Sequence, residues 1–84
     1  MITPEEIKAI LEMALPGSTV ETKDLTGGGD HWQVLIVSPT FEGKGLLEQH
    51  QMVNDALKEA MDTQRIHALT IKPYTPAQWE RLGT

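Results

Sequence analysis

The chain has 84 residues, a formal net charge of −5 and no cysteine. This length predicts one domain over residues 1–84, and the missing thiols exclude a disulfide framework and any thiolate metal site made by this chain alone. Since no apolar run approaches the ~20 residues of a membrane helix and the first residues lack the features of a signal peptide, we expect a cytoplasmic protein that does not bind membranes.

The N-terminal residues carry the signals of a helix start. Thr3 can cap the helix, Pro4 suits the first helical position and Glu6 completes a capping box. Ile2 and Ile7 are spaced for a hydrophobic staple across this cap. Apolar residues then follow at helical spacing, and a Pro-Gly pair ends the predicted helix.

Two strands joined by a glycine-rich loop are expected next. Residues 19–25 alternate weakly, and residues 31–38 (HWQVLIVS) are rich in β-branched side chains. The loop over 26–30 contains three consecutive glycines and is expected to be mobile. Because the connection is short, the two strands are predicted to form an antiparallel hairpin.

The second half of the chain is predicted to form a helix, a strand and a helix. A loop leads into a helix over 46–61, which is followed by a strand over 66–72 and a short helix over 76–82. Thr75 repeats the capping pattern of the first helix. The predicted inner face of the long helix comprises Leu46, His50, Val53, Leu57 and Ala60.

This order of elements indicates an α+β fold. The arrangement αββαβ(α) favours a three-stranded mixed sheet with its helices on one face. The helical crossover between the second and third strands should be right-handed, and it makes these strands parallel if they share the sheet. With two Trp, one Tyr and one Phe in the chain, the core should be mostly aliphatic.

The three histidines are the most versatile side chains, because imidazole titrates near neutral pH and is the commonest metal ligand. His50 falls on the apolar helix face, which favours a histidine at the edge of the core. His31 follows the glycine loop, where it either begins a strand or lies beside backbone that can approach a ligand. His67 alternates with Leu69 and Ile71, so it is predicted to share their face in a structural role or as a ligand.

Two histidines cannot complete a metal site by themselves. Zinc and iron–sulfur clusters usually take four ligands, and clusters favour thiolates. If His31 and His67 bind one metal centre together, another molecule must supply the remaining ligands. Asp30 could contribute an oxygen, although a carboxylate is a poor cluster ligand.

Other motifs give weaker signals. The Glu-Gly-Lys-Gly stretch at 42–45 precedes a helix, where an anion can bind, but it matches neither a Walker loop nor GxGxxG and reads as a turn. Tyr74 and Trp79 form either a docking surface or the closed end of a small core. The spacing reveals no nucleophile–base pair, so we do not expect an enzyme.

Three segments of the chain resemble the BolA family. They are residues 28–34 (GGDHWQV), residues 37–46 (VSPTFEGKGL) with Gln-His at 49–50, and residues 65–76 (RIHALTIKPYTP). The Phe-x-Gly before the second helix and the Ile-His-Ala-Leu before Tyr-Thr-Pro are the most specific matches. The resemblance extends from the first helix to Trp79 and implies a fold similar to class II KH domains.

The resemblance also implies a function. Members of this family pair with monothiol glutaredoxins, and the mixed complex can hold a [2Fe–2S] cluster to which the glutaredoxin cysteine and glutathione supply two thiolates. At the positions that match the family's other two ligands, this chain has His31 and His67. We therefore expect an adaptor in iron–sulfur cluster trafficking or in iron or redox regulation, with Tyr74 and Trp79 framing the partner contact. Formation of a homodimer stays open.

The alternative is a KH-like nucleic-acid-binding transcriptional regulator. Many relatives have an Arg-His-Arg run in the second helix, whereas this chain has Gln-His-Gln at 49–51. Non-specific binding to nucleic acid depends on basic residues that neutralise phosphates. The scattered basic residues, the negative net charge and the missing GXXG loop of KH domains therefore count against this alternative.

Overall fold

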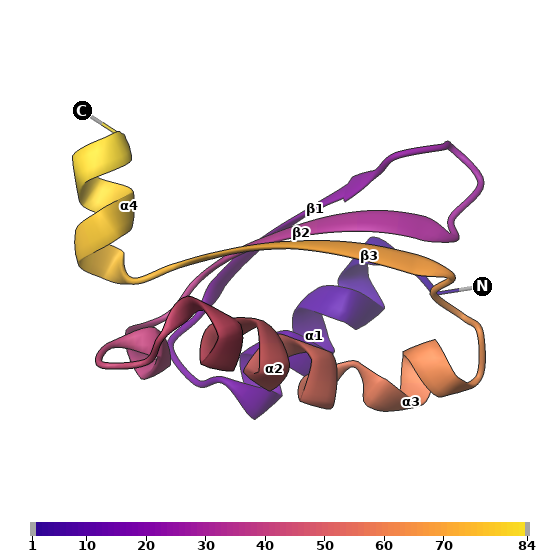
Figure 1. Ribbon diagram of the computed structural model, residues 1–84. Helices are drawn as coiled ribbons and strands as arrows, with labels where there is room; N and C mark the ends of the chain where they lie inside the picture. The colour runs from indigo at the N-terminus through magenta and orange to yellow at the C-terminus, as the bar shows by residue number, and fades with distance from the viewer. Residues whose placement is uncertain (1, 84) are drawn as a thin grey trace.

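A three-stranded mixed sheet forms the centre of the computed structural model, which describes residues 2–83 (Figure 1). The elements are α1 (Pro4–Ala14), β1 (Thr19–Asp24), β2 (His31–Val37), the 3-10 helix η1 (Pro39–Phe41), α2 (Leu46–Ala56), α3 (Lys58–Asp62), β3 (Ala68–Tyr74) and α4 (Pro76–Leu82). The strand order is β1-β2-β3, with β1 antiparallel to β2 and β3 parallel to β2. The predicted α+β class and mixed sheet are therefore confirmed.

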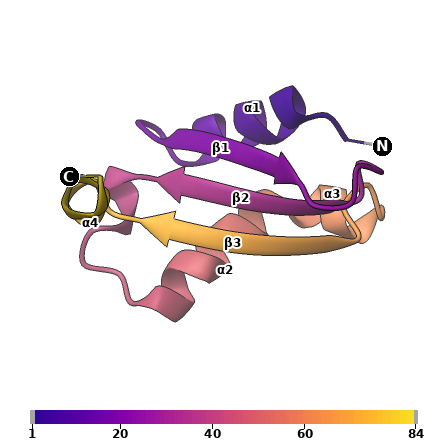
Figure 2. The ribbon, with the colours of Figure 1, turned by 90° about the horizontal axis from the view of Figure 1, so that it is seen from above.

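Within residues 2–83, three of the four α-helices cover one face of the sheet. α1, α2 and α3 lie below the sheet in Figure 1 and behind it in Figure 2, whereas α4 stands apart beyond the end of β3 and points to the opposite side. In β2, Val34 and Ile36 are buried on the helical side, and the alternating Gln33 and Leu35 are half-buried on the other side. The predicted one-sided arrangement holds for α1, α2 and α3. It does not hold for α4, which buries none of its residues against the sheet.

The start of α1 has the geometry predicted from the sequence. The Glu6 N–H donates to Thr3 Oγ1 at 3.1 Å, and the Glu6 carboxylate accepts from the Thr3 N–H at 3.3 Å, which completes a capping box. Ile2 and Ile7 are both buried on either side of this cap, as a hydrophobic staple requires. The local signals at this end of the chain were therefore sufficient to place the helix.

The predicted helix over 46–61 is in fact two helices. α2 ends at Ala56 and α3 begins at Lys58, with Leu57 between them at φ −100° and ψ 12°. Leu57 still donates its N–H to Val53 O at 3.1 Å, and it is only 1 % exposed. The chain thus bends at Leu57 while this side chain stays in the core.

The first turn of α2 also differs from the predicted buried face. Leu46 is 65 % exposed, whereas Gln49 is buried and donates from Nε2 to Lys44 O at 2.9 Å. An amide that bonds loop carbonyls can occupy a buried position, and hydrophobic spacing alone does not detect it. The other predicted members of this face are buried or half-buried: His50, Val53, Leu57 and Ala60.

The third strand spans 68–74 rather than the predicted 66–72. The shift has its cause at the end of α3, where Gln64 has a φ of 60° and the N–H groups of Arg65 and Ile66 both donate to Ala60 O. This C-terminal cap holds Ile66 fully buried before the strand begins. An apolar residue that the pattern assigns to the strand therefore belongs to the preceding turn.

A single apolar cluster lies between the sheet and the three covering helices. Trp32 and Phe41 are its buried aromatic residues, and its other members are aliphatic, as predicted. Among residues 2–83, no helix has both the length and the apolar content needed to cross a bilayer.

Candidate metal centre at the start of two parallel strands

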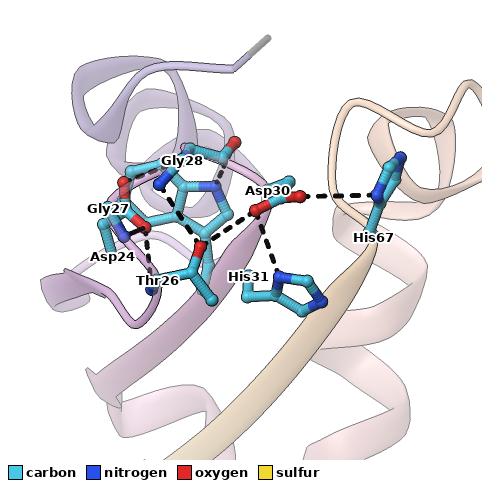
Figure 3. A network of polar contacts seen from close by, with 9 residues as sticks. Asp24, Thr26, Gly27, Gly28, Asp30, His31 and His67 are labelled. Carbon is cyan, nitrogen blue, oxygen red and sulfur yellow. Dashed lines mark hydrogen bonds and ion pairs between the residues drawn. The ribbon is translucent and has the colours of Figure 1, made fainter.

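His31 and His67 lie side by side at one end of the sheet (Figure 3). His31 is the first residue of β2, and His67 directly precedes β3. Because the two strands run parallel, with His31 opposite Ala68, both histidines fall at the same edge. Their ring centroids are 6.4 Å apart, and the rings are nearly perpendicular. The structure therefore brings together the two histidines that the sequence singled out as candidate ligands.

The backbone of Asp30 holds the His67 segment against β2. The N–H groups of His67 and Ala68 both donate to Asp30 O, at 2.8 and 3.2 Å. His67 lies one residue before β3 and so outside the strand that holds Leu69 and Ile71, and the predicted common face stays a prediction. The side chains of His31 and His67 are 41 % and 51 % exposed, so both imidazoles are accessible from solvent.

The Asp30 carboxylate lies between the two imidazoles. Its Oδ1 is 3.1 Å from His31 Nδ1, and its Oδ2 is 3.6 Å from His67 Nδ1. The Thr26 hydroxyl donates to Oδ1 at 3.0 Å. This bond is the main reason why the pKa of Asp30 lies below its usual value; partial burial opposes the lowering and His31 adds to it. Asp30 therefore carries a negative charge at neutral pH.

The glycine-rich loop that leads to Asp30 is organised by a second carboxylate. Asp24 Oδ1 accepts the N–H groups of Thr26 and Gly27, at 3.3 and 2.9 Å, and Asp24 Oδ2 accepts the N–H of Gly29 at 2.9 Å. Gly27 and Gly29 have positive φ angles of 80° and 77°, which glycine adopts without strain. Trp32 Nε1 donates to Gly29 O at 3.1 Å from the core side. The loop expected to be mobile thus has a defined set of hydrogen bonds.

The histidine pair by itself could supply only part of a coordination sphere. Within residues 2–83, no group of three or more His, Cys, Asp or Glu side chains is arranged to hold a metal ion. The donor chemistry nevertheless suits iron or zinc, because neutral imidazole is a strong ligand for both. His31 and His67 therefore fit as two ligands of a centre whose remaining ligands come from elsewhere.

Comparison with known proteins assigns the chain to a family. A family model described as BolA-like protein matches residues 4–78. The chain belongs to the BolA family. Among relatives, this BolA chain is 48 % identical to Protein BOLA2 of Arabidopsis thaliana, over 95 % of this chain and 86 % of that protein. It is 38 % identical to the acid stress protein IbaG of Escherichia coli K12, over 90 % and 87 % respectively.

The fold is likewise similar to solved BolA structures. A bol-like protein from Babesia bovis matches with a TM-score of 0.85 and 34 % sequence identity, covering 100 % of this chain and 96 % of that chain. The family resemblance seen in the sequence motifs is therefore confirmed by both sequence and structure.

In this BolA chain, Tyr74 and Trp79 lie at the opposite end of the sheet from the histidines. Tyr74 ends β3, Trp79 lies on α4, and their ring centroids are 5.5 Å apart. β3 has seven residues, and at about 3.3 Å each the strand separates the two ends by about 20 Å. Trp79 is 40 % exposed. The structure does not place these aromatic residues beside the histidine pair, and their role in partner binding stays a prediction.

A groove of about 500 Å³ opens beside Tyr74. It runs between the first turn of α2, the end of β3 and α4. Leu46 and Leu82 line it and are 65 % and 63 % exposed, so the Leu46 side chain that the sequence assigned to the core faces this groove instead. We call this region the aromatic end of the BolA sheet, and the region around Asp30, His31 and His67 the histidine end.

Proposed function

We propose that this chain is a non-catalytic adaptor that pairs with a monothiol glutaredoxin and supplies His31 and His67 as ligands to a shared [2Fe–2S] cluster. The observation that carries the proposal is the position of the two histidines: they come from separate parts of the chain, lie 6.4 Å apart between ring centroids and are both accessible. The cluster is the cargo of the complex, used in iron–sulfur cluster trafficking or in iron or redox regulation.

The need for a thiolate-bearing partner follows from the ligand count. A [2Fe–2S] cluster takes four protein or cofactor ligands, and thiolates are the commonest of them. This chain has no cysteine, and its histidine pair supplies two ligands at most. A glutaredoxin cysteine and a glutathione thiolate would supply the other two, which is the arrangement that the family resemblance implies.

Histidine ligation would give the shared cluster recognisable properties. Replacing two thiolates with imidazoles on one iron raises the reduction potential relative to all-thiolate clusters. Because imidazole must be neutral to coordinate, protonation competes with iron, and cluster retention should weaken as the pH falls. An all-thiolate cluster held by the glutaredoxin alone would lack these imidazole-dependent properties.

The nucleic-acid alternative finds little support in the arrangement of the basic residues. Lys44 lies near Glu48, Lys58 pairs with Asp62, and Arg65 contacts both Glu6 and Glu59. Cations that already face carboxylates are less available to phosphates. The net charge of −5 adds long-range repulsion of a polyanion.

The proposal is tested by reconstituting the mixed complex without oxygen. This chain, a monothiol glutaredoxin and glutathione are combined with iron and sulfide, and visible circular dichroism is recorded for the wild type, His31→Ala, His67→Ala and the control His50→Ala. We expect either ligand variant to abolish or reshape the spectrum, because each removes one iron ligand, while His50→Ala, changed on α2, retains it. An unchanged spectrum for His67→Ala would contradict the proposal.

A further inference from the structure

We propose that Asp30 is the positioning residue of the histidine end: its carboxylate faces Nδ1 of both His31 and His67 and thereby presents both Nε2 atoms as the metal-binding nitrogens. The orientation of the two rings by Asp30 is a property of the chain by itself. The assignment of Nε2 as the nitrogen that binds the shared cluster rests on the proposed function.

The geometry places one carboxylate oxygen on each imidazole. Oδ1 is 3.1 Å from His31 Nδ1, within hydrogen-bond range, and Oδ2 is 3.6 Å from His67 Nδ1, a charge contact just beyond that range. Figure 3 shows both rings with Nδ1 turned toward Asp30 and the second ring nitrogen on the outer side. The carboxylate therefore acts more strongly on His31 than on His67.

Asp30 is itself fixed from two directions. The Thr26 hydroxyl donates to Oδ1 at 3.0 Å, and the Asp30 carbonyl accepts the N–H groups of His67 and Ala68. The carbonyl bonds thus hold the backbone of Asp30, and the Thr26 bond favours the orientation of its carboxylate toward the rings. A carboxylate whose two oxygens already face Thr26 and both imidazoles is better placed to orient ligands than to become one.

The chemical consequence is a choice of tautomer. A neutral imidazole carries one N–H, and an ionised carboxylate can only accept hydrogen bonds, so the nitrogen of His31 that bonds to it must hold the proton. At 3.6 Å the carboxylate favours the same tautomer of His67 without requiring it. That leaves the lone pair on Nε2, which is the nitrogen available to a metal. Histidine ligands commonly donate their second ring N–H to a carboxylate in this way, and the contact fixes both the ring orientation and the tautomer.

The first test uses the chain without any metal or partner. Long-range ¹H–¹⁵N spectra of histidine-labelled protein at a pH where the imidazoles are neutral should show the Nδ1–H tautomer for His31 and an excess of it for His67. In Asp30→Asn, the amide NH₂ can donate to Nδ1, so at least one ring should shift toward Nε2–H. The control Asp55→Asn, on the exposed side of α2, should change neither ring.

Two results would overturn the inference. One is a wild-type protein in which His31 is mainly Nε2–H, an observation that does not depend on whether the variant folds. The other is a folded Asp30→Asn protein whose tautomers match those of the wild type.

The second test separates this inference from the proposed function. In the mixed complex, Asp30→Asn should lose its cluster about 10 to 100-fold more readily, while the shape of the visible circular dichroism spectrum stays that of the wild type, because the iron ligands are unchanged. A reshaped spectrum would identify Asp30 as a ligand and contradict the positioning role. If the wild type takes up no shared cluster, the proposed function fails, and the tautomer measurement still decides the role of Asp30.

Discussion

The two ends of the sheet are stabilised by different interactions. At the histidine end, the Asp24 carboxylate bonds three backbone N–H groups, and the Asp30 side chain contacts Thr26 and both imidazoles. At the aromatic end, Tyr74 and Trp79 contact each other beside an open groove lined partly by exposed leucines. Polar contacts thus hold the side chains at the histidine end, whereas the aromatic end leaves apolar surface uncovered.

The largest expected difference between the ends comes from their tryptophans. Trp32 is 3 % exposed and bonds Gly29 O, whereas Trp79 is 40 % exposed. We expect Trp32→Ala to lower the free energy of unfolding by about 3–5 kcal/mol, because it opens a cavity in the core. Trp79→Ala should lower it by about 1 kcal/mol, the contribution of one aromatic pair.

Urea denaturation of both variants measures this difference, with Trp32→Phe as a control that keeps a smaller aromatic ring in the core and loses the Gly29 bond. Equal losses of stability in Trp32→Ala and Trp79→Ala would show that the two ends do not differ in this way.

A smaller effect is expected from the carboxylate that organises the glycine loop. In Asp24→Asn, the amide oxygen can still accept from Gly27, but the NH₂ group that replaces Oδ2 cannot accept from Gly29. We expect a loss of stability of about 1 kcal/mol and faster amide hydrogen exchange at Gly29 than at Gly27. Asp62→Asn, which changes an exposed carboxylate on α3, is the matched control. Exchange at Gly29 that stays as slow as in the wild type would argue against this function of Asp24.

The smallest change expected is a gain in stability at the turn that leads to His67. Gln64 is exposed and has a φ of 60°. This backbone conformation costs residues other than glycine about 1 kcal/mol. Gln64→Gly should therefore raise the free energy of unfolding by up to about 1 kcal/mol in urea denaturation. The same substitution at Gln51, in the middle of α2, should lower it by about as much. A destabilised Gln64→Gly protein would mean that the glutamine side chain makes a contribution larger than the backbone strain.

The sequence predicted those parts of the fold that depend on neighbouring residues. The capping boxes at Thr3 and Thr75 satisfy backbone groups three residues away, and both helices begin where predicted. The exposure of Leu46 depends on how the first turn of α2 meets the groove, and the bend at Leu57 keeps that side chain in the core; periodicity describes neither. The late start of β3 has a local cause instead, the cap at Gln64.

The candidate site was predicted in part for the same reason. His31 and His67 were identified by residue type and by resemblance to the BolA family, but their proximity depends on the parallel register that sets His31 opposite Ala68. From the sequence, Asp30 is only a weak candidate ligand, because its position between the rings depends on that register. The function of Asp24 was missed, although an aspartate shortly before a run of glycines is a recognisable signal for side-chain bonds to loop N–H groups.

The Asp30 carbonyl accepts N–H groups from both His67 and Ala68. The distance between the two imidazoles is therefore set by the pairing of the first residues of β3 with β2. If the first residues of β3 fray from β2, the two rings separate, and the cluster proposed to bind them would lose both of its histidine ligands. On the proposed function, release of the shared cluster would then need only the opening of one strand end, a motion far less demanding than unfolding the domain.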